Sequence, residues 1–394
     1  MNKDSQEGRA VNSSLKLIDL RKYDIVHAHF LLGQEVRNQV HTILQRKLSV
    51  LTPQKLKSEI DLAKKCRSDI EEKIHRQRDR AVSAALERYW NCLNAWANGA
   101  ELEAVNHPNL EGVAFTPADL GLLLQMENDG CQIGAYRMAD GGIVIWHTEE
   151  EMDHARFDKL RIASFNISLG TKTWEVFSFI YPDLLPGPAF GWVHDSRSVF
   201  VQAVASLPIK PNLQYSIIAN IATWIILFWG NEIDSKTIIS ELGPFIDGYA
   251  LITASKDKHV INASRVEFGH ELIIAQSLDR LPGSLIYQTN AFSNSSERAF
   301  RKINAIQPRY SYLYHQREVR NSKAVSKLEK NITEDVLSSF YDLICSETGK
   351  DFAYANLDVM GYFLCYISSS STQIKVGSGP AHHDKNYKLL SFAY

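Results

Sequence analysis

Hydrophobic and polar positions alternate with two different periods along the chain. Downstream of Thr52, apolar residues recur at intervals of three or four or at their sums, which is the period of a helix with one buried face. The members of this stripe are Leu56, Ile60, Ala63, Ile70, Ile74, Val82, Leu86, Trp90, Leu93 and Ala97. Thr52 can cap such a helix, Pro53 suits its first turn, and Asn98-Gly99 can end it. The pattern predicts one long helix with a weak point at Gln77.

After Gly99 the pattern becomes strand-like. Two apolar runs, residues 131–138 and 143–148, flank Asp140-Gly141-Gly142 and predict a β-hairpin. Other alternating or β-branched runs predict strands at residues 159–169, 173–181, 198–207, 249–254, 259–268, 284–288, 359–367 and 373–376. Further helices are predicted at residues 118–126, 217–229, 234–242, 295–306 and 332–345. Strands in two groups around long helices predict an α+β fold in which stacked sheets are flanked by helices.

Composition narrows the class of protein. Of 394 residues, 45% are hydrophobic and 22% are charged, which excludes a disordered, collagenous or small disulfide-stapled chain. The net charge of -2 provides no overall field for nucleic acid, so no nucleic-acid partner is expected. The most apolar run, residues 217–229, is too short to cross a bilayer, so no membrane span is expected.

The cysteines indicate the compartment. Cys66, Cys92, Cys131, Cys345 and Cys365 are scattered singly, without a CxxC pair. Such a set is typical of free thiols in a reducing compartment. The first residues contain no apolar signal segment, and we therefore expect a cytoplasmic protein.

Gly130-Cys131 is the candidate for chemistry. Glycine permits a strained backbone that brings the following thiol against the preceding carbonyl, and this geometry allows an N-to-S acyl shift. Hydrolysis of the thioester would cut the chain before Cys131 and leave it a free α-amine. That amine titrates near 8, so part of it is an unprotonated base beside its own thiol. A Gly-Cys pair alone is more often a buried structural cysteine, and the wider context has to decide.

The segment that begins at Gly130 resembles N-terminal-nucleophile amidohydrolases of the isopenicillin N acyltransferase type, with choloylglycine hydrolase relatives. The matching pieces, in family order, are Gly130-Cys131, Asp140-Gly141, residues 143–150, the glycine-rich 181–192, the paired strands of 247–264, the T-N-H-F-like 289–292, the S-x-x-R of 295–298 and the closing 376–383. The resemblance covers roughly Gly99 to His383. It implies a four-layer αββα sandwich preceded by an N-terminal helical segment.

The resemblance also implies a division of the chain and a reaction. Residues 1–130 would form a helical pro-segment or α chain, and residues 131–394 the catalytic chain, with the two remaining associated after cleavage at Gly130-Cys131. Cys131 would attack a small-molecule acyl amide, not a peptide, or an acyl thioester. The acyl-enzyme would then pass to water or to an amine, and the sequence leaves hydrolase and transferase open. No cofactor and no metal are expected.

Individual roles follow only where residues match the family. Cys131 matches the nucleophile, and Asn290 matches an amide that donates to the oxyanion. Glu150 stands where the family has an aspartate that orients the new α-amine. Arg298 would hold a substrate carboxylate or support the site, with a place on the surface as the alternative. His147 replaces an arginine of the choloylglycine relatives at a substrate-binding position. Departures from the family at Thr148, Ala205 and Ala291 leave altered substrate handling or loss of turnover open.

Two other functions compete with this hypothesis. A catalytically inactive member would act as a protein-interaction module that binds a partner through the helix from Thr52 to Ala97, with Trp90 and Trp96, although such an aromatic stripe is more often a contact within the protein's own core. A metal hydrolase would use His147, Glu151 and His154, which are spaced for one helix face. The residues leading into that set are strand-like, which argues against the second alternative.

Overall fold

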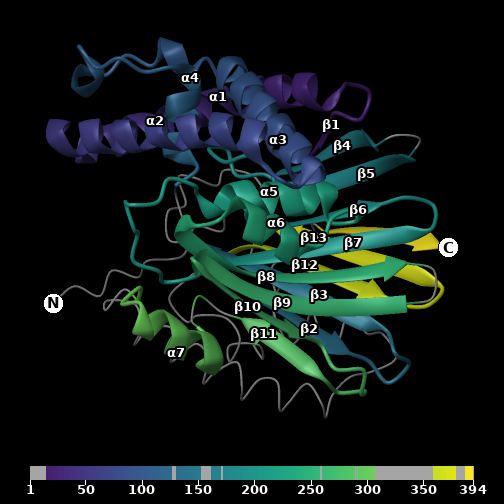
Figure 1. The fold of residues 1–394 in the computed structure, drawn as a ribbon. Helices are drawn as coiled ribbons and strands as arrows, with labels where there is room; N and C mark the ends of the chain where they lie inside the picture. Colours follow the sequence, from purple (N-terminus) through teal and green to yellow (C-terminus); the bar gives the residue numbers. More distant parts are fainter. Residues whose placement is uncertain are drawn as a thin grey trace, which may run out of the picture.

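The computed structural model describes residues 15–126, 130–151, 161–169, 172–257, 260–288, 290, 292–306, 358–378 and 387–393. Within them the chain forms two β-sheets that stack face to face, with helices packed on the outer side of the larger sheet (Figure 1). This arrangement confirms the mixed α+β class predicted from the pattern.

Most helices of the described residues begin at a side chain that caps them. They are α1 (Ile25–Val50), α2 (Pro53–Arg76), α3 (Arg80–Gly99), α4 (Pro117–Leu124), α5 (Ala219–Trp229), α6 (Ser235–Leu242) and α7 (Asn294–Lys302), with short 3-10 turns at Leu102–Ala104 and Pro108–Leu110. Thr52 caps α2 as predicted, since its hydroxyl accepts from the Lys55 amide. Thr116 and Asp119 form a reciprocal capping box on α4.

The predicted single helix from Thr52 to Ala97 is wrong, because the chain forms two helices there. Helix α2 ends at Arg76 and α3 begins at Arg80, where the Asp79 carboxylate accepts from the amides of Ala81 and Val82. The break coincides with the weak point of the stripe. Helix α1 and strand β1 (Lys16–Asp19) were not predicted at all. The predicted helix at 332–345 and Cys345 lie outside the described residues.

The larger sheet has eight strands in the order β1-β4-β5-β6-β7-β8-β9-β10. They are β1, β4 (Arg161–Leu169), β5 (Lys172–Phe179), β6 (Phe190–His194), β7 (Ser198–Ser206), β8 (Phe245–Asp257), β9 (Val260–His270) and β10 (Leu272–Ser277). Strand β1 pairs with β4 in parallel, and the other neighbours are antiparallel. Strand β1 therefore makes the sequence before Gly130 part of this sheet.

The smaller sheet has six antiparallel strands in the order β11-β2-β3-β12-β13-β14. They are β2 (Gly130–Arg137), β3 (Ile143–Glu151), β11 (Leu285–Gln288), β12 (Asp358–Ile367), β13 (Ser371–Ser378) and β14 (Tyr387–Ala393). The pairing of β2 with β3 confirms the predicted hairpin around Asp140-Gly141-Gly142. Strands β6, β10 and β14 were not predicted.

Successive side chains along the strands of the larger sheet point to opposite faces and so contribute to two different hydrophobic cores. One core lies between the helices and the larger sheet and includes Trp96, Phe165, Trp224 and Phe268. The other lies between the sheets and includes Cys131, Phe190, Ala203 and Phe363. The opposite face of the smaller sheet is buried too, at Val144, Trp146, Tyr362 and Leu364. The central strands of both sheets are thus buried on both faces.

No helix of the described residues is long and apolar enough to cross a membrane.

Helices α1 and α3 approach each other through two glycines. A Cβ added to Gly33 would lie 2.2 Å from the Trp96 carbonyl oxygen, and one added to Gly99 would lie 2.0 Å from the Phe30 carbonyl oxygen. Real Cβ atoms do not come this close to backbone oxygens, so neither position has room for a side chain. The fit of the two helices depends on the absence of both methyl groups.

We predict that Gly33→Ala destabilises the protein by about 1–3 kcal/mol, because the added methyl group forces the two backbones apart. Gly121→Ala in α4 is the matched control. Its new Cβ would meet the Cδ1 atom of Leu93 at 3.3 Å, and that side chain can move. Chemical unfolding of both variants measures the difference, and equal stability of the two would contradict the close-packing explanation.

His29 is a buried, neutral imidazole on α1, on the side of the larger sheet that the helices cover. Its Nδ1 donates to the Ile25 carbonyl at 2.7 Å, and its Nε2 accepts from the Trp224 indole at 3.3 Å. The ring stacks on Phe165 with centroids 5.1 Å apart. Burial lowers the pKa of His29 to about 4, although the bond to Ile25 favours the charged form. The native state therefore resists protonation that the unfolded chain accepts.

The contribution of His29 to stability should fall as the pH is lowered from 7 to 4, because the unfolded state binds a proton at His29 that the native state excludes. The contribution at pH 4 is about 3 kcal/mol relative to pH 7. His29→Gln lacks this term, so between pH 7 and pH 4 its free energy of unfolding should fall by about 3 kcal/mol less than that of the wild type. Burial raises the pKa of Asp247 to about 6 and acts in the opposite direction, but equally in both proteins. Parallel pH profiles of the two proteins would refute the assignment.

Candidate active site

Cys131 lies near the start of β2 and faces the space between the two sheets. Its side chain belongs to the core between the sheets, and the residue is 2% exposed. The hairpin register sets Cys131 opposite Glu149 and Ile133 opposite His147. Because side chains of a strand alternate between its two faces, these four residues share one face of the smaller sheet.

A carboxylate and an imidazole lie within reach of the thiol. The Cys131 thiol donates toward Glu149, with Sγ 3.5 Å from Oε1 and 3.6 Å from Oε2. His147 also contacts this carboxylate, with its Nε2 2.9 Å from Oε2. His147 and Glu149 are fully buried. The ligand-type atoms of all three residues lie within 4.8 Å of one another.

Asn290 contacts the backbone of Cys131. Its Oδ1 accepts from the Cys131 amide at 2.9 Å. Its Nδ2 donates to the carbonyl and hydroxyl oxygens of Ser206, at 3.1 and 2.9 Å. Asn290 thus joins the start of β2, in the smaller sheet, to the end of β7, in the larger sheet. Its donor atoms are directed at Ser206 here, and the role of Asn290 as an oxyanion donor stays a prediction.

The structure brings three of the predicted site residues together, namely Cys131, His147 and Asn290. Glu150 is paired with Gly130 in the hairpin, and its side chain lies outside the described set. The carboxylate beside Cys131 belongs to Glu149, one residue earlier. Arg298 lies on α7, and its side chain is exposed. The described structure does not bring it to Cys131.

The alternative metal set does not have its expected geometry. His147 and Glu151 lie on strand β3, so the helical spacing that would gather them on one face does not apply. His154 lies outside the described residues. The metal-type cluster that the described residues do form consists of Cys131, His147 and Glu149.

Sequence reasoning missed Glu149 and Ser206. The signal for Glu149 was present in the hairpin: the Met138 amide donates to the Gly142 carbonyl, and counting outward from that turn places 149 opposite 131. No comparable signal existed for Ser206, because its partner Asn290 comes from a distant segment.

No protein-family model matches this chain, and neither does any curated protein. The case for a function therefore depends on the geometry of the site.

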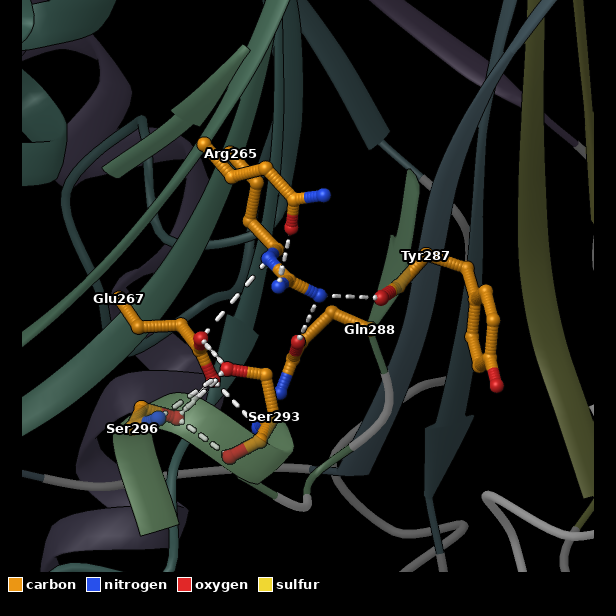
Figure 2. Close-up of polar contacts among 7 residues, drawn as sticks. Arg265, Glu267, Tyr287, Gln288, Ser293 and Ser296 are labelled. Carbon is orange, nitrogen blue, oxygen red and sulfur yellow. Dashed lines mark hydrogen bonds and ion pairs between the residues drawn. The ribbon is translucent and has the colours of Figure 1, made fainter. Parts of the chain in front are cut away.

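A polar network holds the segment that carries Asn290 (Figure 2). The fully buried carboxylate of Glu267 on β9 accepts from the Ser293 amide at 2.9 Å and from the Ser296 hydroxyl at 2.8 Å. It also accepts from the Ser293 hydroxyl, which caps α7. Glu267 therefore fixes the start of α7, three residues after Asn290.

Arg265 holds the other side of the same segment. Its Nη1 donates to the Tyr287 carbonyl at 2.9 Å and to Gln288 Oε1 at 3.1 Å, at the end of β11. Its Nε lies 3.8 Å from the Glu267 carboxylate. Figure 2 shows the guanidinium between the strand end and the start of the helix. Asn290 is thus fixed from both sides.

Replacing the buried carboxylate should cost more than replacing an exposed one. We expect Glu267→Gln to lower the free energy of unfolding by about 2–3 kcal/mol, because an amide cannot accept from three donors and face Arg265 equally well. Glu271→Gln is the control: this exposed residue accepts from the Tyr215 hydroxyl at 2.8 Å and should cost under about 1 kcal/mol. Denaturant unfolding compares the two, and a cost for Glu267→Gln no larger than the control's argues against the network.

Proposed function

We propose that the chain is a cysteine N-terminal-nucleophile amidohydrolase or acyltransferase that matures by cutting itself between Gly130 and Cys131. The observation that carries the proposal is the double engagement of Cys131. The Glu149 carboxylate accepts a hydrogen bond from the Cys131 thiol. Asn290 Oδ1 accepts one from the Cys131 amide, whose nitrogen belongs to the peptide bond that would be cut.

Self-cleavage needs a base for the thiol before any α-amine exists. Glu149 is placed for this role, since its carboxylate already accepts the thiol hydrogen bond. The thiolate would attack the Gly130 carbonyl carbon, the bond from that carbon to the Cys131 nitrogen would break, and the proton held by Glu149 would pass to the nitrogen. Water would then hydrolyse the Gly130 thioester, which releases a carboxylate and the thiol.

The same contacts serve the mature residue. After cleavage the Cys131 nitrogen is an amine, and Asn290 Oδ1 can accept one of its hydrogens and so direct the nitrogen lone pair. This amine can take the thiol proton while Sγ attacks an acyl carbonyl. The amine or thiol leaving group departs with that proton, and water or an amine acceptor then takes the acyl group from Sγ.

The environment of Cys131 favours an acyl donor with apolar groups. Phe190, Phe292 and Leu207 belong to the same core as the thiol. The Phe190 ring also packs 5.2 Å from the His147 ring, measured between centroids. A site of this kind excludes water, and that is a condition for transfer to an amine in competition with hydrolysis.

The architecture supports the proposal at a coarser level. Two stacked sheets with helices on the outer side of the larger one supply three layers of the αββα sandwich. The buried outer face of the smaller sheet, at Trp146 and Leu364, is what a fourth layer requires. The fourth layer and the assignment to this superfamily are part of the proposal.

The interaction-module alternative finds less support. The apolar stripes of α2 and α3, including Leu56, Ile60, Leu86 and Trp96, are buried in the molecule's own core. Trp90 packs partly buried against it. Little of the stripe is left for a partner protein.

Intact mass spectrometry of freshly purified protein tests the proposal. The wild type should give two chains, residues 1–130 and 131–394, of roughly 15 and 30 kDa from average composition. Cys131→Ala should stay whole because it has no nucleophile, and Glu149→Gln should cleave more slowly because the thiol loses its base. Cys365→Ala is the matched control and should cleave as the wild type does.

Activity completes the test. The cleaved wild type should release an initial burst of product from an acyl thioester, with an acyl adduct on the peptide that begins at Cys131. Turnover by an uncleaved chain, or equal fragmentation of Cys131→Ala, would rule the proposed maturation out.

A further inference from the structure

Cys131, His147 and Glu149 bring three different metal-ligand atoms to one buried point. Their Sγ, Nε2 and carboxylate oxygens all lie within 4.8 Å of one another. Two strands of one sheet supply them, because positions 147 and 149 face the same way and 131 lies opposite 149 in the register. The set is therefore held by backbone pairing and does not depend on a flexible loop.

The separations between these ligand atoms suit a small tetrahedral cation. Zinc bonds of about 2.3 Å to sulfur and about 2.0 Å to nitrogen or oxygen place the sulfur and oxygen ligands about 3.5 Å apart, and the nitrogen and oxygen ligands about 3.3 Å apart. Here the Oε2 atom of Glu149 lies 3.6 Å from Sγ and 2.9 Å from His147 Nε2. The sulfur–oxygen edge fits almost without change, and the nitrogen–oxygen edge has to open slightly.

Charge balance also permits the ion. A divalent cation bound by the Cys131 thiolate and the Glu149 carboxylate has its two positive charges balanced by two negative ligands. In an interior where His147 and Glu149 are fully buried and Cys131 is 2% exposed, such neutrality matters because an uncompensated charge is costly. The mixture of thiolate, imidazole and carboxylate favours zinc over calcium or magnesium, which prefer oxygen ligands.

We propose that these three side chains bind one zinc ion, or a similarly thiophilic divalent cation, and that the bound ion blocks the chemistry of Cys131. A metal-bound thiolate is no longer a free nucleophile, and Glu149 could not then serve as its base. The binding itself is independent of chain cleavage, and only the inhibition rests on the proposed function.

The test uses the whole protein, with both chains present if it has cleaved, after removal of metals. Equilibrium dialysis against zinc with metal analysis should find one ion per chain, and cobalt(II) in place of zinc should give the absorption of a tetrahedral thiolate complex. Cys131→Ala, His147→Gln and Glu149→Gln should each weaken binding at least about 100-fold, since a three-ligand site cannot spare a ligand. Far-UV circular dichroism of the metal-free variants checks that each is folded.

Cys365→Ala is the matched control. Cys365 is another buried cysteine in the core between the sheets, and its loss should leave the stoichiometry and the cobalt spectrum unchanged. A further variant, Cys131→Ser, keeps the size of the side chain and should also lose the thiolate absorption. If Cys131→Ala does not fold, Cys131→Ser decides the same question.

Three results would overturn the inference: no ion retained by the wild type, undiminished binding in folded His147→Gln and Glu149→Gln, or a cobalt spectrum without thiolate absorption. Mass spectra of the same samples separate this proposal from the previous one. A chain that stays uncleaved after metal removal and then binds zinc supports the metal site and contradicts self-cleavage, whereas a chain that cleaves when metal-free and binds no zinc does the reverse.

Discussion

The antiparallel pairing of β2 with β3 places Cys131 opposite Glu149 and directs both side chains between the sheets. A slip of one residue would turn one of these strands over, because side chains alternate along it. The thiol, the imidazole and the carboxylate would then face different layers. The turn at Asp140-Gly141-Gly142 fixes the register, since Gly141 has a φ of 82° that favours glycine and the Gly142 amide donates to the Asp140 side chain.

Polar groups this deeply buried need partners, and the site supplies them internally. Glu149 accepts from Cys131 and contacts His147, while Asn290 uses both ends of its amide, on Cys131 and on Ser206. Each contact satisfies a group that would otherwise be costly to bury. The polar partners also set Cys131 apart from the other buried cysteines. Burial raises the pKa of the Cys66, Cys92 and Cys365 thiols, whereas Cys131 is distinguished by a carboxylate and an imidazole at contact distance.

Local signals in the sequence predicted much of the fold. Thr52, Pro53 and the Asp140-Gly141-Gly142 turn act within a few residues, so the start of α2 and the β2–β3 hairpin were legible. Helix α1 also carries a regular stripe, through Ala28, Leu32, Val36 and Val40, but His29 and Gly33 share its buried face and obscured the pattern. The break between α2 and α3 contains neither glycine nor proline, and the Asp79 cap is its main signal.

The candidate site was less predictable because it depends on long-range pairing. Family resemblance selected Glu150 from three consecutive glutamates, but the hairpin register brings Glu149 to the thiol. Asn290 is 159 residues from Cys131 in sequence and reaches it because β11 pairs with β2. The buried carboxylate of Glu267, which steadies the same segment, lies on a strand of the other sheet. No local sequence pattern predicts the contact of Asn290 with Cys131 or that of Glu267 with the start of α7.

Strand β1 has a consequence for how the molecule is made. It pairs with β4, helix α1 packs against the same strand, and α3 packs against α5. The part of the chain before Gly130 therefore shares one hydrophobic core with the part after it. Either part, synthesised alone, would leave apolar residues of this core exposed to water. A molecule cut in the middle would stay in one piece while folded, but its fragments, once denatured, would have to find each other by diffusion, and recovery would then depend on their concentration.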